Sequence, residues 1–131
     1  MSKGKCVIFS APSGSGKTTL VKHLIRYKEL NLEFSVSATT RRPRDNEKPG
    51  IDYLFLSKKD FLENIKNKNF LEFEEVYNDI FYGTYKPLVQ QKLKNHNIIF
   101  DIDVEGALTL KKLFKSKALS VFVKPPSLSV L

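Results

Sequence analysis

A glycine-rich turn between an apolar segment and an amphipathic one constrains this chain more than any other feature. The turn is Ala11-Pro12-Ser13-Gly14-Ser15-Gly16, and it continues directly into Lys17-Thr18-Thr19. Small residues are needed where successive backbone N–H groups must turn inward around the oxygens of a phosphate. The segment matches the P-loop pattern G-x-x-x-x-G-K-[ST], except that alanine replaces the first glycine. It therefore predicts a strand, a phosphate-binding loop and a helix in succession.

The flanking segments favour a functional P-loop over an ordinary strand-to-helix turn. Lys5 to Ser10 is largely apolar, as expected of a buried strand. Lys17 to Lys28 carries four aliphatic residues on one helical face, namely Leu20, Val21, Leu24 and Ile25. We expect residues 11–19 to hold the phosphates of ATP, with Lys17 beside the transferred phosphate and Thr18 offering its hydroxyl to Mg²⁺.

Strand-like and helix-like segments alternate along the rest of the chain. Strands are expected over residues 34–37, 53–56, 70–77, 98–103 and 118–123, and helices from residue 57 and over 86–95 and 105–114. This alternation predicts an α/β fold with a mainly parallel sheet flanked by helices. A further helix is expected to begin at Pro125-Pro126-Ser127, so that the sequence stops within its first turn.

Apolar spacing also predicts which side chains these elements bury. Ser57 lies three residues before Asp60 in a variant of the capping box, which predicts a helix start. That helix is expected to bury Phe61, Leu62 and Ile65. The helix over 105–114 is expected to bury Ala107, Leu108, Leu110, Leu113 and Phe114, and the strand over 118–123 is expected to be buried.

Two carboxylates end the apolar strand expected over residues 98–103. P-loop enzymes place an acid near their metal at the carboxyl end of such a strand, so Asp101 is expected to act on Mg²⁺ directly or through water. Aspartate at a strand end is also common without this function. Asp103 follows two residues later and is expected to point to the same side of the strand.

Composition narrows the class of protein but does not name a partner. The 131 residues contain no apolar run long enough to span a membrane, and no secretory signal is visible. The single cysteine, Cys6, cannot form an internal disulfide, which favours a cytoplasmic location. The net charge of +8 fits a solvated basic surface, nucleic-acid binding or the attraction of small anionic nucleotides. Nucleic acid ranks last, because the lysines are scattered and no reading motif is present.

Five motifs beyond the P-loop resemble those of the guanylate kinase family, in order and at suitable spacing. They are Phe34 to Arg44, Gly50 to Tyr53, Phe70 to Glu72, Tyr82 to Thr84 and Asp101 to Asp103. The resemblance extends through Lys124 to Ser127 and so covers essentially the whole chain. It implies a P-loop core formed by residues 1–33 and 84–131 and a small inserted mixed α/β region, residues 34–83, that binds GMP.

The resemblance also implies a role for each matched residue. The phosphate of GMP would be held by four side chains: Arg41, Arg44, Tyr53 and Tyr82. Arginine suits this role because its planar fork gives paired, charge-assisted hydrogen bonds to phosphate. The catalytic set implied by the family is Lys17, Arg41, Arg44 and Asp101.

The base would be recognised mainly by a carboxylate. Glu72 would accept hydrogen bonds from the guanine ring N–H and the exocyclic amine, a donor pair that adenine lacks. Ser37, Gly83 and Thr84 would complete the GMP site at the base edge, and Asp103 would orient the nucleoside. The partners implied are ATP with Mg²⁺ and GMP, with neither nucleic acid nor membrane expected and the oligomeric state left open.

Each of these residues has an ordinary structural alternative. Arg41 to Arg44 also fits an exposed basic loop, the tyrosines fit packing residues, and Glu72 fits the polar face of a strand. Three other functions stay open: a non-catalytic guanylate kinase-like binding domain, another P-loop kinase or ATPase, and an inactive remnant. Family members continue past this point into a lid with further arginines. We therefore expect a C-terminally incomplete core with weak or no turnover and retained GMP affinity.

Overall fold

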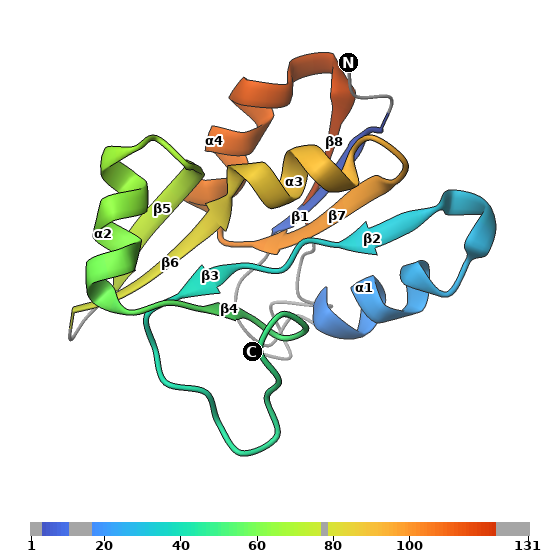
Figure 1. Cartoon of the computed structure of the whole chain (residues 1–131). Helices are drawn as coiled ribbons and strands as arrows, with labels where there is room; N and C mark the ends of the chain where they lie inside the picture. Colours follow the sequence, from blue (N-terminus) through green and yellow to red (C-terminus); the bar gives the residue numbers. More distant parts are fainter. Residues whose placement is uncertain (1–3, 11–16, 77–78, 123–131) are drawn as a thin grey trace, which may run out of the picture. The chain divides into compact units, whose positions relative to one another are not determined.

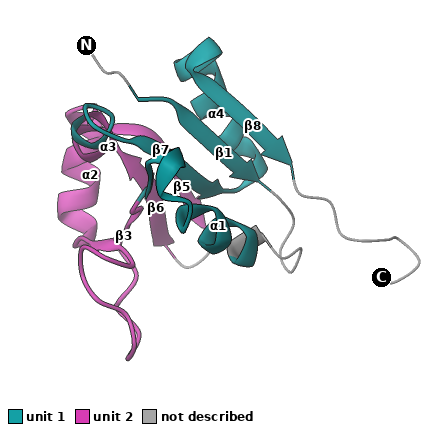
Figure 2. Cartoon of the chain, turned by 90° about the vertical axis from the view of Figure 1, so that its right-hand side faces the viewer, with its two compact units in different colours: residues 1–35, 91–131 teal, residues 36–90 magenta. Residues whose placement is uncertain are grey.

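The computed structural model of the chain describes residues 4–10, 17–76 and 79–122. The glycine-rich turn Ala11–Gly16 and the expected helix start at Pro125–Ser127 lie outside the described residues. The chain divides into two compact units: Met1–Ser35 together with Gln91–Leu131, and Val36–Gln90 (Figure 2). No helix of the described part is both long and apolar enough to cross a membrane.

The first unit is built on a four-stranded, fully parallel sheet with the strand order β2-β7-β1-β8 (Figure 1). Its strands are β1 (Cys6–Ser10), β2 (Leu32–Phe34), β7 (Asn97–Ile102) and β8 (Ala118–Phe122). The two central strands, β1 and β7, carry a nearly continuous buried apolar run, as expected of a sheet covered on both faces. The parallel sheet and the α/β class predicted from the alternation are confirmed.

One helix packs on each face of this sheet. Helix α1 (Lys17–Ile25) places Val21 in a buried cluster with Phe9 and Ile99. Helix α4 (Val104–Phe114) lies on the opposite face, where the ring of Phe114 is 6.4 Å from that of Phe100. Short 3₁₀ segments, η1 (Lys28–Leu30) and η3 (Lys115–Lys117), follow α1 and α4. The sheet is therefore flanked by helices, as predicted.

The predicted burial was wrong at one helix face and at the edge strand. Leu108 and Leu113 of α4 are 59% and 52% exposed, because a surface helix buries only one stripe. That stripe runs through Ala107 and Leu110. Leu119 is 62% exposed, because β8 is the edge strand and α1 contacts the other three strands.

Asp103 was expected at the end of a strand and instead caps a helix. Strand β7 ends at Ile102, and Asp103 is the N-cap of α4. Its carboxylate accepts the backbone N–H groups of Glu105 at 3.1 Å and Gly106 at 3.3 Å. A free helix start offers unpaired N–H groups, and aspartate is among the best residues to satisfy them.

The second unit contains a mixed four-stranded sheet with the order β4-β3-β6-β5. Its strands are β3 (Ala38–Thr39), β4 (Leu54–Phe55), β5 (Phe70–Val76) and β6 (Ile80–Tyr85). Helix α2 (Lys58–Lys66) begins after Ser57, whose hydroxyl accepts the backbone N–H of Asp60, so the predicted cap is confirmed. Helix α3 (Lys86–Lys92) follows β6.

Two predictions for this region were wrong. A strand over 34–37 was expected, but residues 35–37 lie between β2 and β3 and belong to neither. Leu62 was expected to be buried with Phe61, but it is 43% exposed while Phe61 is fully buried. The helix is short, and its apolar stripe is narrow enough to leave the residue beside Phe61 in solvent.

One face of the second sheet is apolar and packs against α2. Ala38, Phe61 and Phe81 form its buried centre, and the ring of Phe70 stacks on Phe61 at 4.3 Å. Gly83 allows this packing, since a Cβ at its position would lie 2.9 Å from the ring of Phe70. The opposite face of the same sheet is therefore available for polar side chains.

Candidate functional site

The candidate site lies on the polar face of the sheet in the second unit. Strand register pairs Glu72 with Thr84 and Glu74 with Tyr82 across β5 and β6. Alternate residues of a strand share a face, so Tyr82 and Thr84 project from the same side, about 7 Å apart along β6. This register places two predicted binding residues, Tyr82 and Thr84, beside each other and the predicted base-reading carboxylate beside Thr84.

Glu72 is oriented by a short hydrogen bond from the neighbouring strand. The hydroxyl of Thr84 donates to Oε2 of Glu72 at 2.6 Å. Thr84 is only 1% exposed and Glu72 is half-buried. A hydrogen bond from a hydroxyl to a carboxylate is charge-assisted and strong, more so where solvent is excluded. The contact therefore fixes one carboxylate oxygen and gives the acceptor a defined direction.

Arg41 is the most tightly held cation of the second unit's polar face. Its Nη1 and Nη2 donate to the two oxygens of Glu47 at 2.8 and 3.0 Å, which makes a bidentate ion pair. Its Nε donates to the hydroxyl of Tyr82 at 3.3 Å, and Nη1 also donates to the carbonyl of Arg42 at 3.0 Å. The guanidinium is therefore fixed in one plane rather than free to rotate.

Tyr53 completes this cluster of aromatic and cationic groups. The guanidinium carbon of Arg41 lies 5.0 Å from the centre of the Tyr53 ring, within the range of a cation–π interaction. The rings of Tyr53 and Tyr82 meet edge-on at 6.1 Å. Arg41, Tyr53 and Tyr82, which lie far apart in the sequence, are thus brought together as one group.

The ion pair shifts the pKa of both partners toward the charged state. The hydrogen bond to Glu47 raises the pKa of Arg41, with smaller contributions from Tyr82 and Tyr53, against a lowering by burial. The hydrogen bonds from Arg41 and from the backbone of Arg44 lower the pKa of Glu47 to about 2. Both groups are therefore ionised throughout the neutral range.

Glu47 was not among the residues singled out from the sequence. It lies in the long segment between β3 and β4, where no apolar period marks which side chains turn inward. The signal available was a carboxylate three residues after Arg44 and six after Arg41, in a stretch where basic residues outnumber acidic ones. At this spacing the Glu47 carboxylate accepts hydrogen bonds from the side chain of Arg41 and from the backbone N–H of Arg44.

Three predicted acceptor residues are placed less specifically. Ser37 is half-buried next to β3, and its carbonyl accepts the N–H of Leu54. Arg44 is exposed, and its backbone N–H donates to Glu47 at 2.9 Å. Gly83 is buried in β6 between the two polar residues, where its small size serves the packing against α2.

The predicted ATP and metal residues belong to the first unit. The structure describes Thr19, which is exposed in α1, but not the turn Ala11–Gly16. Asp101 is half-buried, one residue before the end of β7, and it pairs in register with Phe9 of β1. The strand before the predicted P-loop is therefore hydrogen-bonded directly to the strand that carries Asp101, about 4.8 Å away.

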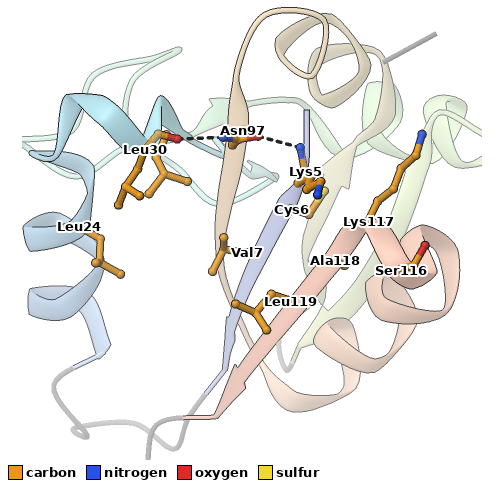
Figure 3. A pocket seen from close by; sticks show the side chains of 11 residues that line it. Lys5, Cys6, Val7, Leu24, Leu30, Asn97, Ser116, Lys117, Ala118 and Leu119 are labelled. Carbon is orange, nitrogen blue, oxygen red and sulfur yellow. Dashed lines mark hydrogen bonds between the residues drawn. The ribbon is translucent and has the colours of Figure 1, made fainter. Parts of the chain in front are cut away.

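A separate cavity of roughly 470 Å³ opens in the first unit near the starts of β1 and β8 (Figure 3). Its walls are mainly apolar, and Asn97 spans one side by bonding the N–H of Lys5 and the carbonyl of Leu30. In parallel α/β sheets ligands bind beyond the carboxyl ends of the strands. This cavity lies at the amino ends, so it is not the predicted phosphate site.

Taken together, the described side chains can recognise an anion and a pair of N–H donors. Arg41 with Tyr53 and Tyr82 offers a positive charge and hydroxyl donors, whereas Glu72 offers carboxylate acceptors. The residues that contact Arg41 and Glu72 from β6, Tyr82 and Thr84, project from one face of that strand. That combination matches a ligand with a phosphate at one end and a donor-rich ring at the other.

Comparison with protein families gives a match over nearly the entire chain. Residues 3–131 match the family described as guanylate kinase. A guanylate kinase from Bacteroides thetaiotaomicron is 51% identical over 129 residues, which cover 98% of this chain and 63% of that protein. One from Porphyromonas gingivalis is 48% identical over 128 residues, which cover 97% of this chain and 68% of that protein.

A solved structure gives the same match in three dimensions. The crystal structure of guanylate kinase from Anaplasma phagocytophilum aligns with a TM-score of 0.77 at 30% sequence identity. The alignment covers 98% of this chain and 64% of that one. The chain therefore spans a little under two thirds of the length of several of the proteins it resembles.

Proposed function

Because the chain belongs to the guanylate kinase family, we propose that it transfers the γ-phosphate of ATP to GMP, giving ADP and GDP. The observation that carries the proposal is the polar face of the second unit. There Tyr82, which contacts Arg41, and Thr84, which contacts Glu72, project from the same face of β6. Arg41 with the two tyrosines would bind the GMP phosphate, and Glu72 would bind the guanine base.

Glu72 is proposed to select guanine over adenine. Guanine presents a ring N–H beside an exocyclic amine, and a carboxylate can accept from both at once. Adenine at the same place would leave the half-buried carboxylate facing a ring acceptor, with its hydrogen bonds unmade. Thr84 supports this selection because its hydroxyl orients the carboxylate.

The first unit is proposed to hold ATP and Mg²⁺. Residues 11–19 would wrap the phosphates, Lys17 would neutralise the transferred phosphate, and Thr18 and Asp101 would hold the metal. Asp101 fits this role because its hard oxygen ligand sits on the strand next to the one that enters the P-loop. Mg²⁺ would supply charge neutralisation at the phosphate oxygens.

Transfer of this kind requires positioning and charge neutralisation rather than a nucleophilic side chain. Arg41 and Arg44 are proposed to neutralise the acceptor phosphate so that its oxygen can approach a second anion. The buried free thiol Cys6 is in keeping with a cytoplasmic setting, which we propose as the location.

The proposal is tested by following GDP formation from ATP and GMP by chromatography, with protein equimolar to the substrates so that slow transfer is seen. GDP should form with GMP and not with AMP as acceptor. Lys17→Ala and Arg44→Ala should each lower the rate by at least about 100-fold. Lys22→Ala is the matched control, since it removes an exposed lysine from the same helix as Lys17.

Three results would contradict the proposal. The first is that GDP formation is unchanged by Lys17→Ala, which would remove the P-loop from the reaction. The second is that AMP accepts phosphate as readily as GMP, which would remove Glu72 from base selection. The third is that no GDP forms under these conditions, which would contradict catalysis by this chain.

A further inference from the structure

Glu47 ties together the two arginines of the proposed phosphate site. Its carboxylate accepts from the side chain of Arg41 through both oxygens, at 2.8 and 3.0 Å. Its Oε1 also accepts the backbone N–H of Arg44 at 2.9 Å. The Arg41 and Glu47 side chains are 12% and 18% exposed, so neighbouring atoms cover most of their surface. One carboxylate therefore fixes the side chain of one arginine and the backbone of the other.

Arg41 keeps little donor capacity for a phosphate while Glu47 holds it. A guanidinium carries five N–H bonds. In the described contacts four of these have acceptors: two on Glu47, one on the Tyr82 hydroxyl and one on the carbonyl of Arg42. At most one N–H remains, so a bidentate fork toward phosphate would require Glu47 to leave. Glu47 either positions Arg41 or occupies the place that the phosphate takes.

The contacts favour positioning over displacement. Expelling Glu47 would break three hydrogen bonds and leave its charge in a mostly shielded position. Tyr82 and Tyr53 hold the same guanidinium from other sides, so its plane is set before any ligand arrives. Preset orientation lowers the entropy that an arginine loses when it meets a phosphate.

We infer that Glu47 is a positioning residue of the acceptor site, which orients Arg41 and the backbone of Arg44 toward the GMP phosphate without touching GMP. The inference rests on the proposed function, because it takes the two arginines as the phosphate ligands. Arg41 then meets the phosphate protonated and with its plane already fixed. The hydroxyls of Tyr53 and Tyr82 complete the contact.

The test compares binding of GMP and of guanosine by calorimetry in the 131-residue chain. Glu47→Gln keeps the size of the side chain but removes its charge and one acceptor oxygen. We expect it to weaken GMP binding roughly 10- to 100-fold. Guanosine has no phosphate, so its affinity, measured by competition, should stay within about twofold.

The matched control is Asp52→Asn. Asp52 is an exposed residue of the same segment between β3 and β4. Among the hydrogen bonds of the described residues, its side chain accepts only the nearby backbone N–H of Lys48, at 2.7 Å. This variant should bind GMP as the parent chain does. Glu47→Asp, which keeps the charge, provides a second variant if Glu47→Gln does not fold, and it should retain more GMP affinity than Glu47→Ala.

Each remaining outcome overturns the inference in a distinct way. Unchanged GMP affinity in Glu47→Gln would show that the arginines need no positioning, and tighter binding would make Glu47 a competitor of the phosphate. Equal weakening of GMP and guanosine would indicate a general structural role. If the parent chain itself binds no GMP, the proposed function fails and the inference fails with it. This outcome differs from the others because it is seen in the parent chain and not only in the Glu47 variants.

Discussion

At the scale of single residues, the contact between Thr84 and Glu72 carries the selectivity of the proposed site. Its donor is almost fully buried and the hydrogen bond is 2.6 Å long. Thr84→Val keeps the shape of the side chain but removes the donor, so Glu72 loses its orientation. We expect the free energy of unfolding to fall by roughly 1 kcal/mol, measured by urea denaturation, and GMP binding to weaken several-fold, measured by calorimetry.

The control for this change is Thr84→Ser, which restores the hydroxyl and should recover GMP affinity to near the parent value. Serine loses only a methyl group, whose burial contributes about 1 kcal/mol to stability. Equal loss of GMP affinity in the serine and valine variants would assign the effect to packing. The hydrogen bond would then have no part in base recognition.

The sequence predicts individual residues of this site better than it predicts their contacts. Arg41, Tyr53 and Tyr82 were expected to act together, and they do lie in one cluster. The pairing of Glu72 with Thr84 depends on strand register, which shifts between Phe70 and Glu72 and which sequence spacing alone does not fix. Glu47 lies in a segment without periodicity, so no apolar pattern marked it as inward-facing.

At the scale of elements, the start of α2 supports the sheet that carries the site. The hydroxyl of Ser57 accepts the N–H of Asp60 at 3.0 Å, and the helix then presents Phe61 to the apolar face. Ser57→Ala leaves that N–H without its cap. We expect the free energy of unfolding to fall by about 1 kcal/mol in urea denaturation. Ser57→Asp, which can still cap, should stay close to the parent, and an equal loss in both variants would contradict the capping role.

Elements were predictable where pattern and local chemistry agree, and less so at edges. The capped helix α2, the long strand β5 and the buried strand β7 follow the predicted segments closely. The bounds of α4 and β8 also follow the prediction, but the burial expected for their leucines was wrong. Burial there depends on which neighbouring element covers a face, and the type of an apolar residue does not indicate which element that is.

At the scale of the whole molecule, Cys6 reports on the integrity of the parallel sheet. It is 1% exposed, and burial raises the pKa of its thiol to about 12, against a smaller lowering by the charge of Lys117. The thiolate is the reactive form, so native protein at pH 8 should react with a disulfide reagent only through unfolding. Labelling should therefore be at least about 100-fold slower than in urea-unfolded chain. Comparable rates in both states would show that β1 opens readily without denaturant.

This chain is proposed to bind GMP through a carboxylate that recognises guanine and an arginine cluster that recognises phosphate. The most direct measurement is a calorimetric titration of the chain with GMP and, separately, with AMP. We predict saturable binding of GMP and affinity for AMP that is lower by at least about 100-fold. Equal affinity for the two nucleotides, or no binding of GMP, would contradict the account.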